Sequence, residues 1–264
     1  MKILLTNDDG IHAEGLRVLY ELLKPKHSVT VVAPDRERSA VGHGITLDRP
    51  IRAEKIALNG GWEGFAVTGT PADCIKLAVV ELLKTKPELV ISGINPGANV
   101  GVNINYSGTV AAAREAALYG IPAIAVSVQA RAPRAYLDIA GFIRLLAEDI
   151  HRIGLPSGTF LNVNFPDTPI RQIAGIRISR QGFALFSEYF EKRKDPRNRI
   201  YYWQGSDVQP ISDDPDIDGD ALSRNYISIT PIKCDMTDYN LLNDLKSWAL
   251  SMNYGNPSRS GGSS

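Results

Sequence analysis

Cysteine is scarce in this sequence: only Cys74 and Cys234 occur among 264 residues. No pairing motif surrounds either one, so we interpret both as free thiols, one in a segment typical of a helix and one at a strand end. Apolar runs are also short, and none approaches the roughly 20 residues that span a bilayer. The N-terminal residues lack the basic region and cleavage site of a signal peptide. We therefore expect a cytoplasmic protein without a membrane segment.

The sequence also has no excess charge, because 29 basic and 29 acidic residues balance. Without a broad basic field, we expect no binding to a nucleic acid polymer or an anionic membrane. Any recognition of phosphate must then come from a local site. A hydrophobic fraction of 44% and a charged fraction of 22% are typical of a globular protein.

Short β-rich runs alternate with amphipathic helical segments in the first half of the chain, which is the pattern of parallel βαβ units. The expected strands cover residues 2–6, 28–34, 88–93 and 121–127, and a β-hairpin is expected over 51–69. The expected helices cover residues 13–24, 70–83, 109–120 and 135–153. The second helix has the clearest start, with Thr70 as N-cap, Pro71 at the first helical position and Asp73 in the first turn.

After Gly158 the alternation of strands and helices ends, and shorter runs typical of β-strands predominate. We interpret them as antiparallel hairpins that project from the α/β core; they read TFLNVNFP, GIRISRQG, RIYYWQG and NYISITPI. The charged segment FEKRKDPRNR is typical of a solvated hairpin tip. A terminal helix is expected over residues 238–250, followed by a disordered tail over 255–264.

Two neighbouring carboxylates, Asp8 and Asp9, follow the first expected strand. Ligands of open parallel sheets bind outside the carboxyl ends of the strands, which is where this pair lies. The pair is consistent with a helix cap and turn, and also with a cation site, because adjacent carboxylates repel unless a cation neutralises them. Ser39 and Asn95 follow two other strands and offer further oxygen ligands.

Ser107, Gly108 and Thr109 stand where a helix is expected to begin. Free backbone N–H groups, the positive end of the helix dipole and two hydroxyls favour an anion there, phosphate above all. The same residues are also consistent with an ordinary helix cap. The preceding loop, residues 92–109, is rich in glycine and asparagine, and a structureless connection of this length is typical of a functional loop. It follows neither the Walker nor the dinucleotide-binding pattern.

His43 stands between two glycines and is a candidate general acid or hydrogen-bond donor, although a loop histidine is more often only solvated. The acidic run DDPDIDGDA, residues 213–221, matches the first half of a calcium-binding loop. Asn225, however, occupies the position of the bidentate glutamate. We interpret this run as an acidic loop without a metal.

Six segments in order resemble the SurE family, the stationary-phase survival proteins of bacteria and archaea, which are metal-dependent nucleotidases. They read TNDDG, PDRERSAVGHGITL, TGTPADC, SGINPGANVG, YSGTVAAAREA and YISITPI. The resemblance runs from Met1 to about Leu250. It implies an α/β fold with a Rossmann-like, mostly parallel sheet sandwiched by helices, a C-terminal β-hairpin extension and a terminal helix. It also implies one domain over 1–254, with a core over 1–157 and an oligomerisation region over 158–254.

The resemblance further implies a phosphoric monoester hydrolase acting on nucleoside 5′-monophosphates, with 3′-monophosphates and short polyphosphate as further substrates. One divalent ion per subunit, Mg²⁺ or Mn²⁺, would be held by Asp8, Asp9, Ser39 and Asn95. The candidate catalytic residues are Asp8, Asp9 and Asn95, and the candidate phosphate-binding residues are Asn7, His43, Asn99, Ser107, Gly108 and Thr109. A homodimer or homotetramer is implied, with exchange of the region after about Asp220.

The residues leave parts of the mechanism open. Asp8 or Asp9 is expected to orient or deprotonate an attacking water, but direct attack by one of them through a phosphoaspartate is an alternative. A nucleotide-binding or sugar-nucleotide transferase would share the α/β sheet and the acidic metal ligands. A non-catalytic stress protein with a structural metal is the other alternative.

Overall fold

The computed structural model describes residues 1–58, 60–130, 135–183, 188–206 and 214–248. The chain divides into two compact units, Met1–Cys234 and Asp235–Ser264. Among the described residues, no helix combines the length and the apolar character needed to cross a membrane. Both cysteines are free, as predicted.

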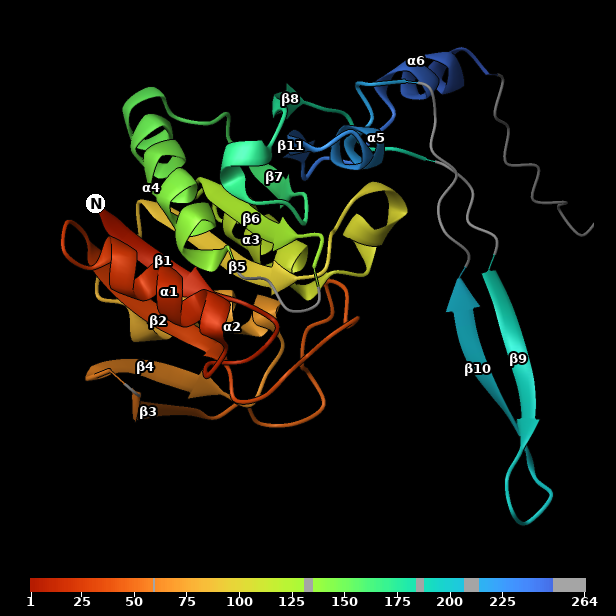
Figure 1. Ribbon diagram of the computed structural model, residues 1–264, viewed down its shortest axis with the longest axis horizontal. Coiled ribbons are helices and arrows are strands. Elements are labelled where there is room, and N and C mark those ends of the chain that lie inside the picture. Colours follow the sequence, from red (N-terminus) through yellow and green to blue (C-terminus); the bar gives the residue numbers. More distant parts are fainter. Residues whose placement is uncertain (59, 131–134, 184–187, 207–213, 249–264) are drawn as a thin grey trace, which may run out of the picture. The chain divides into compact units, whose positions relative to one another are not determined.

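A nine-stranded sheet forms the centre of the first unit (Figure 1). Its spatial order is β3-β4-β2-β1-β5-β6-β7-β11-β8. The strands are β1 (Lys2–Thr6), β2 (Ser28–Pro34), β3 (Ala53–Leu58), β4 (Trp62–Val67), β5 (Leu89–Pro96), β6 (Ala123–Val128), β7 (Thr159–Phe165), β8 (Gly175–Ile178) and β11 (Tyr226–Lys233). Six neighbouring strands, from β4 to β7, pair in parallel, whereas β3 is antiparallel to β4 and β11 to β7. The predicted α/β fold with a mostly parallel sheet is confirmed.

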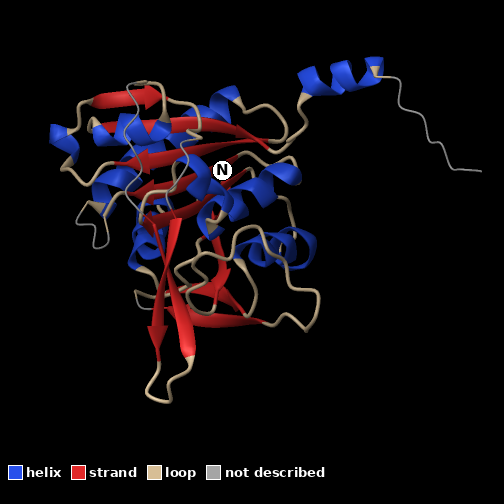
Figure 2. Ribbon diagram, turned by 90° about the vertical axis from the view of Figure 1, so that its right-hand side faces the viewer, coloured by secondary structure: helices blue, strands red, loops and turns tan. Residues whose placement is uncertain are grey.

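Helices cover both faces of this sheet (Figure 2). They are α1 (Glu14–Leu23), α2 (Pro71–Leu77), α3 (Gly108–Leu118), α4 (Tyr136–Ile153) and α5 (Asp218–Ser223), with the short helices η1 (Ala78–Leu82), η2 (Gly101–Asn105) and η3 (Ile170–Gln172). In the second unit, α6 (Tyr239–Ser247) begins after Asp238, which caps it. The predicted terminal helix is thus present, although residues 249 and 250 lie outside the described range.

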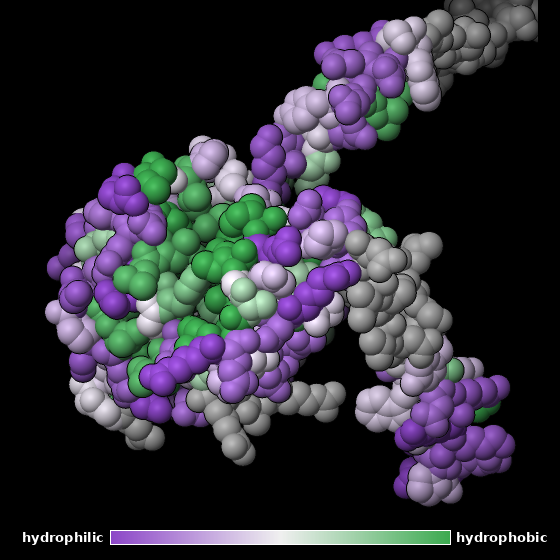
Figure 3. All heavy atoms as spheres, turned by 45° about the horizontal axis from the view of Figure 1, so that its top comes forward, coloured by the Kyte–Doolittle hydropathy of each residue, from purple (hydrophilic) through white to green (hydrophobic). Residues whose placement is uncertain are grey.

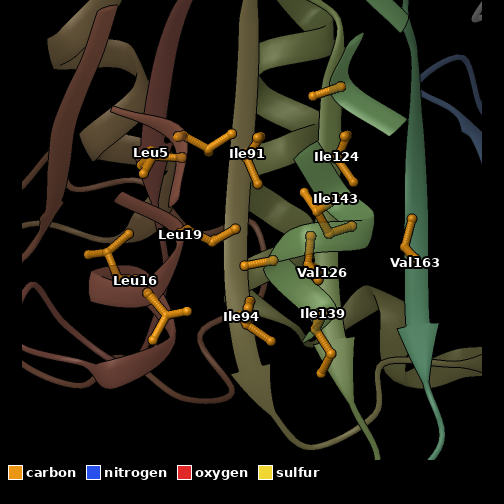
Figure 4. Packing of buried hydrophobic residues seen from close by; sticks show 14 of the residues in the cluster. Leu5, Leu16, Leu19, Ile91, Ile94, Ile124, Val126, Ile139, Ile143 and Val163 are labelled. Atoms are coloured by element: carbon orange, nitrogen blue, oxygen red, sulfur yellow. The ribbon is translucent and has the colours of Figure 1, made fainter. Parts of the chain in front are cut away.

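Two hydrophobic clusters hold the helices on the sheet. On one face, Leu16 and Leu19 of α1 and Ile143 of α4 pack with Leu5 and Ile91 of the central strands (Figure 4). On the other face, α2 and α3 pack on the strand residues that point the opposite way. Successive residues of β1 enter different clusters, which is how a strand covered on both faces must behave.

The segments after Gly158 differ from the prediction. β7, β8 and β11 extend the main sheet instead of forming separate hairpins. Among the strands that the structure describes after Gly158, only β9 (Glu188–Lys194) and β10 (Ile200–Ser206) form a hairpin separate from the main sheet, and the charged segment makes its turn as expected. Apolar side chains gather on the face of the main body seen in Figure 3, and Leu137 of α4 and Ile176 and Ile178 of β8 are among the exposed apolar residues.

The acidic run over 213–221 is only partly the loop that we predicted. Asp216 is exposed, as expected for an acidic loop, but α5 begins inside the run at Asp218. Asp218 and Asp220 are buried. The residues before Asp214 lie outside the described range.

Candidate active site

The central strand β1 ends in a tight turn at the carboxyl edge of the sheet. β2 and β5 lie on opposite sides of β1, so the strand order reverses here, which is where open α/β sheets bind ligands. Asn7 closes the turn by donating from Nδ2 to the Gly10 carbonyl oxygen at 2.9 Å. Gly10 has a φ of 99°, and a Cβ there would lie 3.0 Å from the carbonyl carbon of Arg36. The turn therefore requires glycine, and it holds Asn7 and the two acids in place.

Asp8 points into the structure and is only 5% exposed. Its carboxylate accepts a hydrogen bond from the Thr109 hydroxyl, and its backbone oxygen accepts one from the Arg38 N–H at 2.7 Å. Burial raises the pKa of Asp8, and the hydrogen bond from Thr109 opposes that rise in part. Asp8 thereby joins the end of β1, the loop after β2 and the start of α3.

Asp9 has a different environment. Burial, then the charges of Asp8 and Glu37, raise the pKa of Asp9 to about 7. Its Oδ2 atom is buried and has no hydrogen-bond partner among the described residues. Within the same part of the chain, neither Asp8 nor Asp9 forms an ion pair. Two neighbouring acids are thus desolvated, and no cationic side chain of the described residues forms an ion pair with either one.

The start of α3 lies directly against Asp8. Ser107 caps the helix by accepting a hydrogen bond from the Val110 N–H at 3.2 Å. Gly108 is the first helical residue, and a Cβ on it would lie 2.8 Å from the Cβ of Asp8. Gly108 therefore allows the helix N-terminus to approach the acidic pair, so that its first N–H groups and positive dipole end face Asp8. The Thr109 hydroxyl is engaged with Asp8.

Asn95 lies near the end of β5, which continues to Pro96 and so extends into the segment that we predicted as a loop. The pairing of β5 with β6 shifts register before Asn95, which then stands opposite Ser127. Its amide nitrogen donates to the Gly97 carbonyl oxygen at 2.7 Å. Together with η2, this extension shows that the expected structureless loop over 92–109 is largely ordered by backbone pairing and helix formation.

Asn99 is buried and forms the centre of a hydrogen-bond network. Its N–H donates to Oδ1 of Asn164, and its side-chain amide donates to the Ser127 hydroxyl, both at 2.8 Å. Its carbonyl oxygen accepts from the amides of Asn162 at 2.8 Å and Asn164 at 3.1 Å. All of these partners come from β6 and β7. Sequence reading missed Asn162 and Asn164, although asparagines within an apolar strand run were an available signal.

Ser39 and His43 lie in the loop after β2. Ser39 is exposed, its hydroxyl donates to Glu37, and it follows Arg38, whose N–H contacts Asp8. His43 is turned toward α3, with its Nε2 atom 2.7 Å from Oε2 of Glu115. The neighbouring Gly42 N–H donates to the Tyr106 carbonyl oxygen at 2.9 Å. The loop is therefore attached to α3 at Glu115 and to the end of η2 at Tyr106.

Glu115 and Tyr136 are two residues near the site that sequence reading missed. Glu115 is buried on α3 and also accepts from Nζ of Lys76 at 3.1 Å. Burial alone would raise the pKa of Glu115, but hydrogen bonds from His43 and Lys76 outweigh it and the pKa lies below its usual range. Burial, together with the charges of Asp9 and Glu14, raises the pKa of Tyr136 to about 12. A lone acid in an alanine-rich helix was the available signal for Glu115.

The fold and these contacts define a Rossmann-like α/β protein with an acidic pair, one buried and one partly buried, set against a helix N-terminus. Residues 3–188, which include all of these site residues, match the family model described as Survival protein SurE. The chain belongs to the SurE family.

Several relatives are similar over almost the full length. A protein of Desulfatibacillum aliphaticivorans named 5′-nucleotidase SurE is 59% identical over 250 residues, which cover 95% of this chain and 99% of the relative. A protein of Syntrophobacter fumaroxidans with the same name is 48% identical over 95% of this chain and 100% of its own length. The crystal structure of the SurE protein from Aquifex aeolicus is similar with a TM-score of 0.81 and 38% identity, covering 93% of this chain and 98% of that one.

Proposed function

We propose that this chain is a phosphoric monoester hydrolase that converts nucleoside 5′-monophosphates to nucleoside and phosphate. The observation that carries the proposal is the placement of Asp8, with Asp9 next to it in sequence, against the N-terminus of α3. Helix N–H groups suit the phosphate, and acids suit the activation of water or the binding of a cation. The nucleotide is proposed as the substrate because the relatives are named 5′-nucleotidase SurE. Nucleoside 3′-monophosphates and short polyphosphate are proposed as further substrates.

The acidic pair fits a divalent metal ion. The buried Oδ2 atom of Asp9 has no partner among the described residues, and the two acids repel each other, so a cation would satisfy both needs. No cluster of three or more His, Cys, Asp or Glu residues with metal-site geometry occurs in the described part of the chain, so the other oxygens must come from neutral groups. We assign one ion per subunit, Mg²⁺ or Mn²⁺, to Asp8, Asp9, Ser39 and Asn95. When bound, the ion would neutralise phosphate charge and make a water more acidic.

The chain's own residues divide the remaining work. The first N–H groups of α3, with Ser107 and Gly108, hold the phosphate oxygens. Thr109 fixes the orientation of Asp8 through its hydroxyl. Because Asp8 is held by Thr109, we assign Asp9, whose Oδ2 atom has no hydrogen-bond partner among the described residues, to orient and deprotonate the attacking water. Attack by Asp9 itself would instead leave a phosphoaspartate, which rapid quenching followed by hydroxylamine treatment detects.

The test is phosphate release from a panel of nucleotides with Mn²⁺, Mg²⁺ or a chelator. We expect release from AMP or GMP alone with a metal, and none with the chelator or with the Asp9→Asn variant. No release from any nucleotide with any metal contradicts the proposal. A transferase would need a second substrate before it consumed the nucleotide. In a protein whose metal is only structural, Asp8→Asn would change the melting temperature without an activity to lose.

We also propose that residues 1–254 act as one α/β domain and that 158–254 serve assembly into a homodimer or homotetramer. Exposed aromatic side chains on both strands of the β9-β10 hairpin support this, since a two-stranded hairpin alone is marginally stable in water. They include Tyr189, Phe190, Tyr202 and Trp203. Light scattering coupled to size-exclusion chromatography tests the assembly, and a monomer at all concentrations contradicts it.

A further inference from the structure

Gly101, the first residue of η2, is held on both sides of its backbone by side chains from the C-terminal part of the chain. Its N–H donates to Oδ2 of Asp218 at 2.8 Å, and its carbonyl oxygen accepts from Nε2 of Gln181, also at 2.8 Å. We call Gln181 and Asp218 the Gly101 clamp. Gly101 itself has a φ of 59°, a left-handed conformation that other residues rarely adopt.

Asp218 is fully buried, and its two carboxylate oxygens both accept backbone hydrogen bonds. Oδ2 accepts from Gly101, while Oδ1 accepts from the N–H groups of Gly182 at 3.1 Å and Gly219 at 2.9 Å. A carboxylate can accept on both oxygens, whereas an asparagine would place an NH₂ group against one of these donors. The arrangement therefore requires an acid at position 218.

Backbone hydrogen bonds also join the two stretches of chain that carry the clamp residues. The Arg180 N–H donates to the Asp216 carbonyl oxygen at 2.8 Å, and the Asp218 N–H donates to the Arg180 carbonyl oxygen at 3.0 Å. These bonds form a short parallel bridge between Arg180 and Ile217. Both clamp residues lie next to this bridge, which joins the two stretches of chain that carry them.

Gly101 lies in the chain between two groups of candidate site residues. Asn95 and Asn99 precede it, and Ser107 and Gly108 follow it after the single short helix η2. Asn99 is anchored to β6 and β7 by hydrogen bonds. The end of η2 is held by the buried Ile104 and by the hydrogen bond from the Gly42 N–H to the Tyr106 carbonyl oxygen, and the clamp holds its first residue. The clamp thus fixes the first residue of η2, the short helix that connects Asn95 and Asn99 to the start of α3.

We propose that Gln181 and Asp218 are positioning residues of the active site, which hold Gly101 so that Asn95 and the N-terminus of α3 face the same phosphate. This inference rests on the proposed nucleotidase function. It also assigns a role to the acidic run, which the nucleotidase motifs do not use. Loss of the clamp should lower kcat more than it changes KM for the nucleotide, because the reacting groups remain present but are displaced.

The experiment compares Asp218→Asn, Gln181→Met and the control Asp216→Asn, whose exposed side chain lies two residues from Asp218. Each variant is measured for kcat and KM with a nucleoside monophosphate, for thermal unfolding, and for hydrogen exchange over residues 97–107. We expect Asp218→Asn to lower kcat about tenfold or more, since displacements near 1 Å are enough for such losses. Exchange over 97–107 should rise, and Asp216→Asn should match the wild type.

Gln181→Met keeps the size of the side chain and removes only its hydrogen bond to the Gly101 carbonyl oxygen. It therefore tests the positioning role of the clamp if Asp218→Asn does not fold. It should show a smaller loss of kcat with the same rise in exchange. Wild-type kcat in a folded Asp218→Asn variant, or in Gln181→Met when the former is unfolded, overturns the proposal. If the wild type hydrolyses no nucleotide, the proposed function fails, and exchange alone decides the clamp: faster exchange upholds it and unchanged exchange overturns it.

Discussion

The hydroxyl of Thr109 donates a hydrogen bond to the carboxylate of Asp8, a residue 101 positions earlier in the chain. Both side chains are buried, so this bond orients Asp8 where water cannot compete for it. It also fixes α3 to the end of β1. The relative position of the phosphate-binding helix and the acidic pair therefore depends directly on one hydroxyl group.

Replacement of Thr109 by valine tests this dependence. Thr109→Val keeps the shape but leaves a buried carboxylate oxygen without its donor, which should cost about 1–3 kcal/mol of unfolding free energy. We expect nucleotidase activity to fall about tenfold or more. Thr109→Ser retains the hydroxyl and should keep most of the activity. Equal activity in the two variants contradicts the orienting role, and denaturant unfolding with initial rates of phosphate release measures both effects.

Asp9→Asn should have opposite effects on activity and on stability. Burial, Asp8 and Glu37 raise the pKa of Asp9 to about 7, so without a metal ion its charged form destabilises the fold. Stability is lost as the pH rises from about 4 to about 7, and the full loss is present above that range. At about pH 8 with a chelator, Asp9→Asn should therefore melt several degrees higher than the wild type. Its activity should be at least 100-fold lower, since one of the assigned groups is gone.

Asp9→Asn should also change how the melting temperature responds to a metal ion. Mg²⁺ or Mn²⁺ should raise the melting temperature of the wild type but not that of Asp9→Asn, because ligand binding stabilises only the form that binds it. Asp138→Asn, an exposed change on α4, is the control and should respond to metal as the wild type does. Identical metal responses of the wild type and Asp9→Asn contradict the assignment of Asp9 as a ligand.

His43 can be separated into a positioning and an acid role by substitution. Because His43 is bound to Glu115 on α3, we expect it to hold the Ser39 loop in place. Glutamine can donate a hydrogen bond to Glu115 but cannot act as an acid at neutral pH. His43→Gln should therefore retain more activity than His43→Ala, which we expect to lose about tenfold. Equal losses in the two variants, with an altered pH profile, indicate general acid catalysis instead.

The local elements could be predicted because each has a local cause. β1 spans Lys2–Thr6 as expected, since an apolar run bounded by polar residues marks a strand covered on both faces. α2 begins at the expected Pro71 because its capping box uses only neighbouring residues. The placement of β7, β8 and β11 in the main sheet could not be predicted, because strand pairing is decided by contacts distant in sequence.

The candidate site likewise contains residues that local sequence could indicate and residues whose roles depend on contacts distant in sequence. Asp8, Asn95 and Ser107 could be proposed as site residues from the sequence because each stands at a strand end or a helix start, where parallel sheets bind ligands. Glu115, Gln181 and Asp218 were missed because their partners lie 72, 80 and 117 residues away. Composition alone favoured an acidic loop without a metal at Asp218. Only the folded chain shows that a buried carboxylate there meets three backbone N–H groups.

Gly108 permits the contact between α3 and Asp8, and Gly108→Ala should break it. The added Cβ would lie 2.8 Å from the Cβ of Asp8 and 3.1 Å from Cγ of Pro71, so one of these groups must move. We expect a loss of about 1–3 kcal/mol in unfolding free energy and about 100-fold in activity. Gly141→Ala is the matched control: Gly141 lies inside α4 with no atom within 4 Å of a new Cβ, so alanine should stabilise the protein by about 0.5–1 kcal/mol and leave activity unchanged. Full activity in Gly108→Ala contradicts the close approach of the helix to the acidic pair.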